Sequence, residues 1–268
     1  MNVVVISQTG LPAHLNGHYR GIDIRPVQDG ERIGLEYWFD KNRSPIVVST
    51  SATVVSIPVQ SARISELNDL VLLIECAFGM VSTSGYQSCE IVAKLSGQKI
   101  LLGEISPAGA RIRPPAYVEG LSGLTLAALF HRVWSAYVRA GGKIHVTTDR
   151  FVRFLRNDTS PDALVDLCIS LESLLDAKTE ISFRFSTLLA KQCGTNNAKH
   201  ASDTLGRLYD FRSKVVHGAD PRKEYSKLEP MLPALRQYAR QILGNYFLFL
   251  SEGTKEAWRV ALKDKLLE

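Results

Sequence analysis

The sequence predicts an α+β protein built from two parts: a mixed strand and helix module over residues 1–110, followed by an all-helical domain over residues 111–268. Three observations lead to this prediction. Before residue 60, short segments rich in Val, Ile, Thr, Tyr and Trp are separated by Gly, Pro and Asn, as strands and turns are. Residues 106–115 contain Pro and Gly and have the composition of a linker or long loop. Beyond them, apolar residues recur at three- and four-residue spacing, which is typical of helices.

In the amino-terminal module, extended segments are expected over residues 19–24, 31–39 and 45–58. Residues 61–77 carry apolar side chains at helical spacing. Residues 90–105 return to an alternating pattern and predict two strands with a turn near residues 96–98. We interpret this module as a sensor or regulatory unit without catalytic residues.

In the helical domain, residues 121–140 have the apolar stripe of an amphipathic helix, and Gly141 and Gly142 follow it. Thr148 or Asp149 is expected to cap the next helix, which runs through Leu155.

The triplet Ser160, Pro161 and Asp162 predicts the start of a third helix, because proline suits the first helical position and an acidic side chain suits the first turn. That helix is expected to run to residue 175. Gly194 and Gly218 stand where glycine ends helices. The remaining helices are predicted over residues 181–192, 198–216, 228–250 and 255–267.

Composition and charge limit the class of protein. With 45% hydrophobic and 22% charged residues, the 268-residue chain has the make-up of a globular protein with a sizeable core. The start of the chain lacks the positive region of an export signal, and no apolar run approaches the roughly 20 residues of a membrane span. The four cysteines show no metal or redox spacing, so we expect mostly buried, reduced thiols in a cytoplasmic protein.

The stretch Leu-Tyr-Asp-Phe-Arg-Ser-Lys-Val-Val-His-Gly over residues 208–218 contains the strongest candidate site. It places Arg212 and His217 at the end of a predicted helix. A guanidinium can bind a phosphate with two hydrogen bonds, and an imidazole can move a proton near neutral pH. These two groups are sufficient for cleavage of RNA without a metal ion.

Helix geometry separates these two side chains. Five residues turn an α-helix by about 140°, so Arg212 and His217 cannot both point at one phosphate from a single regular helix. A second copy packed about a two-fold axis could complete the site. His217 would lie in the last turn, where the helix dipole favours its protonated form.

Three segments together, residues 166–175, 180–185 and 208–218, resemble the HEPN superfamily, specifically its Apea-like branch. The resemblance covers about residues 147–253. It implies an all-helical bundle, usually a homodimer, and many members are metal-independent endoribonucleases of phage defence, toxin-antitoxin pairs or RNA processing. It also implies that Arg212 and His217 are the catalytic pair. Ser213 follows the arginine directly, at a position where the family more often has Asn, Asp or His.

Three supporting residues complete the prediction: Glu172, Ser213 and Tyr209. Glu172 either lies on the surface or orients Arg212. A purely structural alternative stays open, in which Arg212 pairs with Asp210 or Glu172 inside the bundle and His217 bonds a helix-end carbonyl. Tyr209 is expected in the core or an interface rather than under a stacked base.

The net charge of +5 favours a polyanionic partner only weakly. The basic residues in the middle of the chain suit either a solvated surface or a phosphate-binding track; they are Arg132, Arg139, Lys143, Arg150, Arg153 and Arg156. His14 and His18 lack a third metal ligand, and the sequence has no glycine-rich phosphate loop and no nucleophile elbow. We therefore expect no metal and no cofactor.

The leading hypothesis is a HEPN-type endoribonuclease effector of prokaryotic anti-phage defence or a toxin-antitoxin system. Its partners would be RNA, a second copy of the chain and, in some settings, a regulatory protein. No membrane partner is expected. The alternative is a catalytically silent HEPN-like module for dimerisation or nucleic-acid binding.

Overall fold

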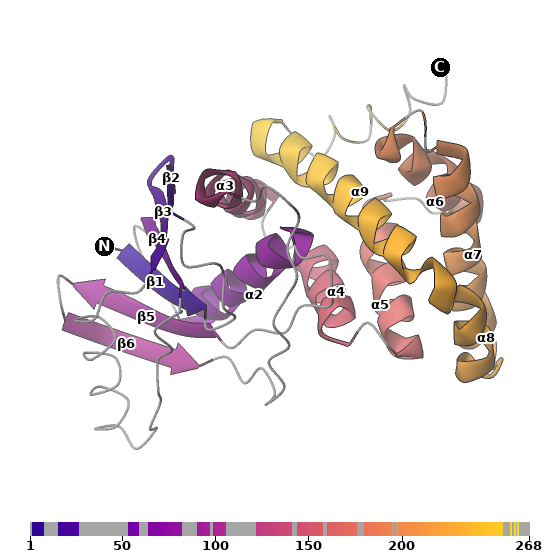
Figure 1. Cartoon of the computed structure of the whole chain (residues 1–268), viewed down its shortest axis with the longest axis horizontal. Coiled ribbons are helices and arrows are strands. Elements are labelled where there is room, and N and C mark those ends of the chain that lie inside the picture. The colour runs from indigo at the N-terminus through magenta and orange to yellow at the C-terminus, as the bar shows by residue number, and fades with distance from the viewer. Residues whose placement is uncertain are drawn as a thin grey trace. The chain divides into compact units, whose positions relative to one another are not determined.

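The computed structural model describes residues 2–7, 16–26, 53–58, 64–81, 90–96, 99–105, 122–140, 144–157, 160–175, 180–194, 196, 198–253, 258, 260 and 262. The backbone divides into two compact units, Met1–His131 and Arg132–Glu268. The first unit contains a β-sheet, and every element described after residue 140 is a helix. The protein therefore has an α+β fold (Figure 1).

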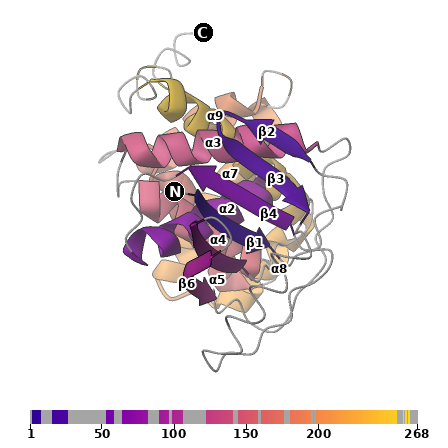
Figure 2. The same ribbon diagram turned by 90° about the vertical axis from the view of Figure 1, so that its left-hand side faces the viewer.

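The sheet of the first unit has six strands: β1 (Asn2–Ser7), β2 (Gly17–Tyr19), β3 (Ile22–Pro26), β4 (Thr53–Pro58), β5 (Glu90–Ser96) and β6 (Lys99–Ile105). Their order is β2-β3-β4-β1-β5-β6, and every neighbouring pair is antiparallel. Figure 2 shows β3, β4 and β1 side by side. Helix α2 (Ile64–Val81) contacts β5, and its residues 73–81 are buried.

The predicted strand pair over residues 90–105 and the helix over residues 61–77 are confirmed. The single extended segment over residues 19–24 is wrong, because Arg20 (φ 50°) and Gly21 (φ 84°) turn the chain between β2 and β3. Positive φ at two successive residues is the backbone of a type I′ hairpin turn. Strand β4 confirms the last part of the extended segment predicted over residues 45–58. The segment predicted over residues 31–39 lies outside the described residues.

Helix α3 (Gly123–Ala140) confirms the helix predicted over residues 121–140. The hydroxyl of Ser122 accepts a hydrogen bond from the backbone N–H of Thr125 at 3.1 Å and so caps its first turn. The division between the two units falls within this helix. The expected boundary at residue 110 and the linker over residues 106–115 lie outside the described residues.

Besides the end of α3, the described part of the second unit contains six helices and two 3-10 turns. The helices are α4 (His145–Arg156), α5 (Pro161–Glu172), α6 (Ile181–Ala190), α7 (Ala198–Val216), α8 (Pro221–Leu228) and α9 (Leu232–Glu252). The 3-10 turn η2 (Lys191–Cys193) follows α6, and η4 (Glu229–Met231) precedes α9. Helix α5 is central, because it contacts α4, α6, α7, α8 and α9. Its leucines and those of α7 and α9 form the core, including Leu164, Leu167, Leu171, Leu205, Leu208, Leu235 and Leu243.

Several predicted helix ends are confirmed. The Ser160 hydroxyl accepts a hydrogen bond from the Ala163 N–H at 3.2 Å, with Pro161 in the first turn of α5. Gly194 (φ 83°) and Gly218 (φ 92°) adopt the positive φ expected of glycines that end helices.

The predicted cap of α4 is wrong, because the helix begins at His145, before both candidate residues. Thr148 is buried, and its hydroxyl donates to the carbonyls of Ile144 and His145 at 3.1 Å. A threonine hydroxyl can bond a carbonyl of its own helix in this way, so Thr148 lies inside the first turn.

The single helix predicted over residues 228–250 is wrong at its start. Asp220 caps a separate helix, α8, by accepting a hydrogen bond from the Arg222 N–H at 2.9 Å. Pro230 and Pro233 have no backbone N–H to continue α8 into α9, so a 3-10 turn separates the two helices. Of the helix predicted over residues 255–267, only residues 258, 260 and 262 are described.

Candidate functional site

The candidate site lies at the end of α7, where the helix stops in a defined way. The N–H of Ala219 donates to the carbonyl of Lys214 at 2.9 Å, and the N–H of Gly218 donates to the carbonyl of Val215 at 3.1 Å. Together with the positive φ of Gly218, these bonds form a Schellman motif. His217 is therefore the cap residue of α7, and its position relative to the helix is fixed by the backbone.

Arg212 forms an ion pair with Glu172 of α5. The Nη2 atom of Arg212 lies 3.7 Å from Oε2 of Glu172, and the two side chains are 30% and 24% exposed. Within the described part of the chain, the buried Nε of Arg212 has no hydrogen-bond partner. Glu172 thus lies beside one Nη atom of a guanidinium that carries five N–H donors in all.

Tyr209 and Cys168 adjoin this ion pair. The half-buried ring of Tyr209 lies 5.4 Å from the ring of Phe185 on α6. Burial raises the pKa of Tyr209, and the nearby carboxylate of Glu172 raises it further. Burial likewise raises the pKa of the Cys168 thiol, one turn before Glu172, so this cysteine is a packed thiol rather than a nucleophile.

His217 stands apart from the other predicted site residues. Its side chain is exposed, and its backbone N–H donates to the carbonyl of Ser213 at 3.1 Å. Among the described residues, no hydrogen bond or ion pair joins the imidazole to Arg212. The structure thus brings Arg212, Glu172 and Tyr209 together, and it leaves His217 on the surface beside the half-buried Ser213.

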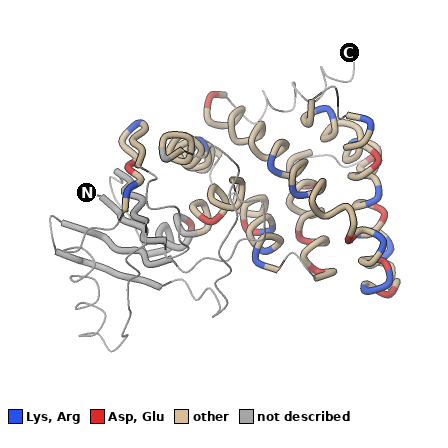
Figure 3. Tube along the Cα trace, in the orientation of Figure 1, with Lys and Arg blue, Asp and Glu red and all other residues tan. Residues whose placement is uncertain are grey.

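Charges of both signs surround the end of α7. Lys214 lies 3.4 Å from Glu224 of α8, and Lys227 also pairs with Glu224. The two lysines lower the pKa of Glu224, Lys227 having the larger effect. Figure 3 shows basic and acidic positions interspersed along α7 and α8.

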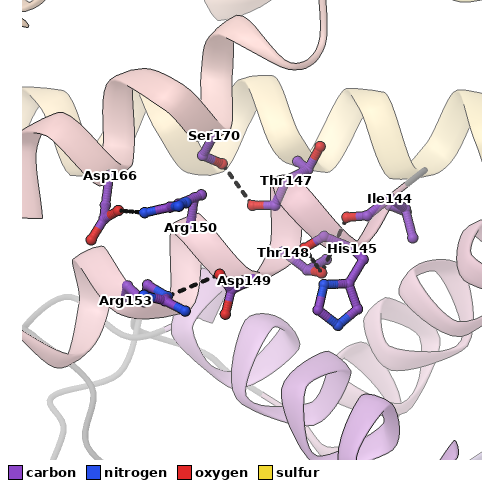
Figure 4. A network of polar contacts seen from close by, with 9 residues as sticks. All are labelled: Ile144, His145, Thr147, Thr148, Asp149, Arg150, Arg153, Asp166 and Ser170. Carbon is purple, nitrogen blue, oxygen red and sulfur yellow. Dashed lines mark hydrogen bonds and ion pairs between the residues drawn. The ribbon is translucent and has the colours of Figure 1, made fainter. Parts of the chain in front are cut away.

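The basic residues of α4 are matched by carboxylates. Arg150 lies 2.6 Å from Asp166 of α5, and Arg153 lies 2.9 Å from Asp149 (Figure 4). Arg139 donates to the carbonyl of Gly253 at 3.5 Å. These contacts favour the solvated surface over the phosphate-binding track.

Sequence reasoning missed a group of buried hydroxyls next to Glu172. Thr147, Ser170 and Ser173 bond to one another between α4 and the end of α5. It also missed a hydrogen bond of 2.6 Å between His200 and Tyr238, near the other end of α7. The sequence did contain one sign of the buried hydroxyls, because Ser and Thr stand at positions where helical spacing predicts core residues.

The other histidines considered as metal ligands do not form a metal site in the described residues. His18 bonds Asp23 on the β2–β3 hairpin, whereas His14 lies outside the described residues. In the described ranges, no three side chains of His, Cys, Asp or Glu are grouped so that they could hold a metal ion.

The described cysteines Cys76, Cys168 and Cys193 are buried and free, as expected, and Cys89 is not described. None of the described helices is both long and apolar enough to cross a bilayer.

Comparisons with protein-family models, with curated proteins and with solved structures found no match to this chain.

Proposed function

We propose that the protein is a metal-independent endoribonuclease of the HEPN type. The observation that carries the proposal is the pairing of Arg212 with Glu172 at the end of α7, one turn before the exposed His217. An arginine that is oriented by a carboxylate and still has unpaired N–H groups can bind a phosphate. An exposed imidazole can transfer protons at neutral pH once a second copy of the chain brings it to the same phosphate.

In this mechanism, a ribose 2′-oxygen attacks the adjacent phosphorus. One His217 takes the proton from the 2′-hydroxyl as the O2′–P bond forms, and a protonated His217 donates a proton to the 5′-oxygen as the P–O5′ bond breaks. Arg212 stabilises the negative charge that develops on the phosphoryl oxygens. The products are a 2′,3′-cyclic phosphate and a 5′-hydroxyl.

Two copies of the chain supply the two imidazoles. Residues five apart on a regular helix point about 140° apart, so one copy is not expected to present both Arg212 and His217 to one phosphate. Val216 lies between them in the sequence and is 59% exposed, and so offers an apolar contact for a second copy. An isologous dimer at this end of α7 would place two arginines and two histidines around one cleft.

The biological setting belongs to the same proposal. A HEPN-like bundle with this site suits an RNA-cleaving effector of the cytoplasm, in anti-phage defence or a toxin-antitoxin system. The sheet-containing unit would then sense a trigger or restrain the nuclease, alone or with a regulatory partner protein. The resemblance of residues 147–253 to the family supports this setting.

A catalytically silent module is the second candidate function. The ion pair of Arg212 favours it, because a guanidinium neutralised by Glu172 binds an anion less strongly than a free one. The matched charges of α4 favour it as well, since they leave little net positive charge there to attract nucleic acid. Such a module would dimerise or bind nucleic acid without cleaving it.

Cleavage of single-stranded RNA in excess chelator separates the two functions. The nuclease should cut RNA, spare DNA of the same sequence because DNA lacks the 2′-hydroxyl, and leave 2′,3′-cyclic phosphate ends. Wild-type protein that binds RNA but never cuts it, assayed together with its trigger or regulatory partner, would establish the silent module instead.

A further inference from the structure

Glu172 is the last residue of α5, at a helix end that no glycine terminates. Ser173 follows it in right-handed helical conformation, with φ −61° and ψ −17°. The last carbonyls of a helix lack donors within the helix. In the turn after α5, backbone N–H groups bond the carbonyls of Ile169, Leu171 and Glu172, whereas the carbonyl of Ser170 accepts a side-chain hydroxyl. The position of Glu172 therefore depends on what holds residues 170–175.

Three buried or partly buried hydroxyls hold this end of α5, and we call Thr147, Ser170 and Ser173 the hydroxyl cluster. The Ser170 hydroxyl donates to the carbonyl of Thr147 at 2.8 Å, a bond visible in Figure 4. The Ser173 hydroxyl donates to the carbonyl of Ser170 at 2.6 Å. The hydroxyls of Thr147 and Ser173 lie 2.6 Å apart.

The hydrogen-bond directions in the hydroxyl cluster follow from counting protons. A hydroxyl has one proton to donate, and Ser173 gives its proton to the Ser170 carbonyl. Thr147 is therefore the donor to the Ser173 hydroxyl, whereas Ser170 and Ser173 donate to the backbone carbonyls of Thr147 and Ser170. Thr147 and Ser170 are 1% and 0% exposed, so water does not compete with the bond between them.

A fourth group bonds the residues just after Glu172. The indole Nε1 of Trp258 donates to the carbonyl of Leu174 at 3.0 Å. The indole is fully buried and contacts the rings of Tyr246 and Phe249, at 5.3 Å and 5.6 Å. Side chains from α4 and from the segment after α9 thus fix both sides of Glu172.

We infer that the hydroxyl cluster positions Glu172 and, through it, the guanidinium of Arg212. This inference rests on the proposed function, because only a phosphate-binding Arg212 needs such positioning. The ion pair is already long at 3.7 Å, so a small displacement of the end of α5 separates its partners. Thr147, Ser170 and Ser173 are positioning residues, since none of their recorded bonds reaches Arg212 directly.

The first test needs no catalytic activity. The rate at which phenylglyoxal modifies Arg212 is measured by mass spectrometry in the full chain. Removing the carboxylate in Glu172→Gln should raise this rate about threefold, as expected for the loss of a weak ion pair. Thr147→Val, which removes the hydroxyl at nearly constant volume, should raise it similarly. In the double variant the two effects should not add, because both act through the same ion pair.

Thr148→Val is the matched control. Thr148 is the neighbouring buried threonine, and its hydroxyl bonds only carbonyls at the start of its own helix, those of Ile144 and His145. The Arg212 modification rate in Thr148→Val should equal that of the wild type. Ser173→Ala, at a half-buried position, serves as a second variant of the hydroxyl cluster in case Thr147→Val does not fold.

The second test measures RNA cleavage. Thr147→Val should lower kcat about tenfold with little change in KM, as expected for a misplaced phosphate-binding group, and Thr147→Ser should restore it. The inference would be overturned if Thr147→Val and Glu172→Gln changed the modification rate additively. It would also be overturned if Thr147→Val and Thr148→Val changed that rate equally. A wild type that shows the expected modification pattern but no cleavage would overturn the nuclease alone and leave the positioning role intact.

Discussion

At the scale of the residue, Glu172 decides how Arg212 can act. The sequence left open whether this carboxylate lies on the surface or pairs with the arginine, and the two side chains form an ion pair. The carboxylate lies beside the guanidinium and offsets its positive charge. A phosphate must compete with Glu172 for part of the guanidinium, and so tight RNA binding is not expected of Arg212 alone.

His217→Ala should reduce RNA cleavage by at least about a hundredfold, the lower range for the loss of a general acid-base group. The exposed imidazole makes no recorded packing contact in the described structure, so the free energy of unfolding should stay close to the wild-type value. The cleavage rate of a labelled single-stranded RNA measures the effect. His200→Ala near the other end of α7 is the control and should cut normally. Equal rates in wild type and His217→Ala would remove His217 from the mechanism.

Arg212→Ala should impair cleavage to a similar degree, because it removes the stabilisation of charge on the phosphoryl oxygens. Arg212→Lys should recover only part of the rate, since an ammonium cannot bind a phosphate with two parallel bonds. Kinetics on the same RNA measure both variants, and Arg207→Ala, an exposed arginine of the same helix, is the control. Full activity of Arg212→Ala would contradict the assigned role.

The sequence pointed to Arg212, His217 and Glu172 as candidates because they lie within or beside helices whose spacing is easy to recognise. It could not identify the hydroxyl cluster, since Thr147 and Ser173 are 26 residues apart and meet only when α4 packs against α5. Thr148 shows the same limit. Its residue type suits a helix cap, and only the fold places it inside the first turn.

At the scale of the element, α7 and α5 end in different ways. A glycine with positive φ ends α7, and that signal is local, so the sequence predicted it correctly. Side chains from distant segments hold the end of α5, and the sequence predicted three residues too many for that helix. Proline likewise explains why α8 and α9 are separate although the apolar spacing predicted one helix.

Gly218→Ala should lower the free energy of unfolding by about 1 kcal/mol, the cost of a side chain at positive φ. A Cβ atom at this position would meet no atom within 4 Å, so the cost is conformational rather than steric. Urea unfolding followed by circular dichroism measures it.

Gly206→Ala is the matched control for that prediction. This glycine lies inside α7, and its Cβ atom would contact the Cβ of Ser186 at an ordinary 3.8 Å. The substitution should raise the free energy of unfolding by up to about 1 kcal/mol, because alanine favours the helix interior. A loss of stability in Gly206→Ala together with none in Gly218→Ala would contradict the assigned roles of both glycines.

At the scale of the whole molecule, the two units differ in architecture, with an antiparallel sheet in one and successive helices in the other. The change in hydrophobic spacing after residue 115 predicted this difference. The first strand was not predicted, because its run of valines carries no alternation to mark it. The predicted site residues all belong to the second unit.

The protein should form a homodimer through its helical unit, because a single copy does not bring Arg212 and His217 to one phosphate. Light scattering at micromolar concentration should give twice the mass of the 29.7 kDa chain. Val216→Glu should yield monomers and abolish cleavage, since it puts a charge on the expected contact. Val138→Glu, at another exposed valine, should stay dimeric. A monomeric wild type that still cuts RNA would contradict the composite site.

Polar substitutions in the first unit should leave the chemistry of cleavage unchanged. His18→Ala removes the exposed contact with Asp23 and should retain the wild-type kcat on RNA. A hundredfold loss of kcat, with fold and dimer intact, would show that the first unit contributes directly to the reaction.

The bond from Trp258 to Leu174 also has a consequence for the order in which the protein forms. The two residues are 84 positions apart, so on the ribosome α5 emerges well before its indole donor. At about 5–20 residues per second, this delay lasts about 4–17 s. Throughout that time the end of α5 lacks one of the bonds that hold it. The segment that carries Glu172 therefore acquires this bond only after Trp258 has been synthesised.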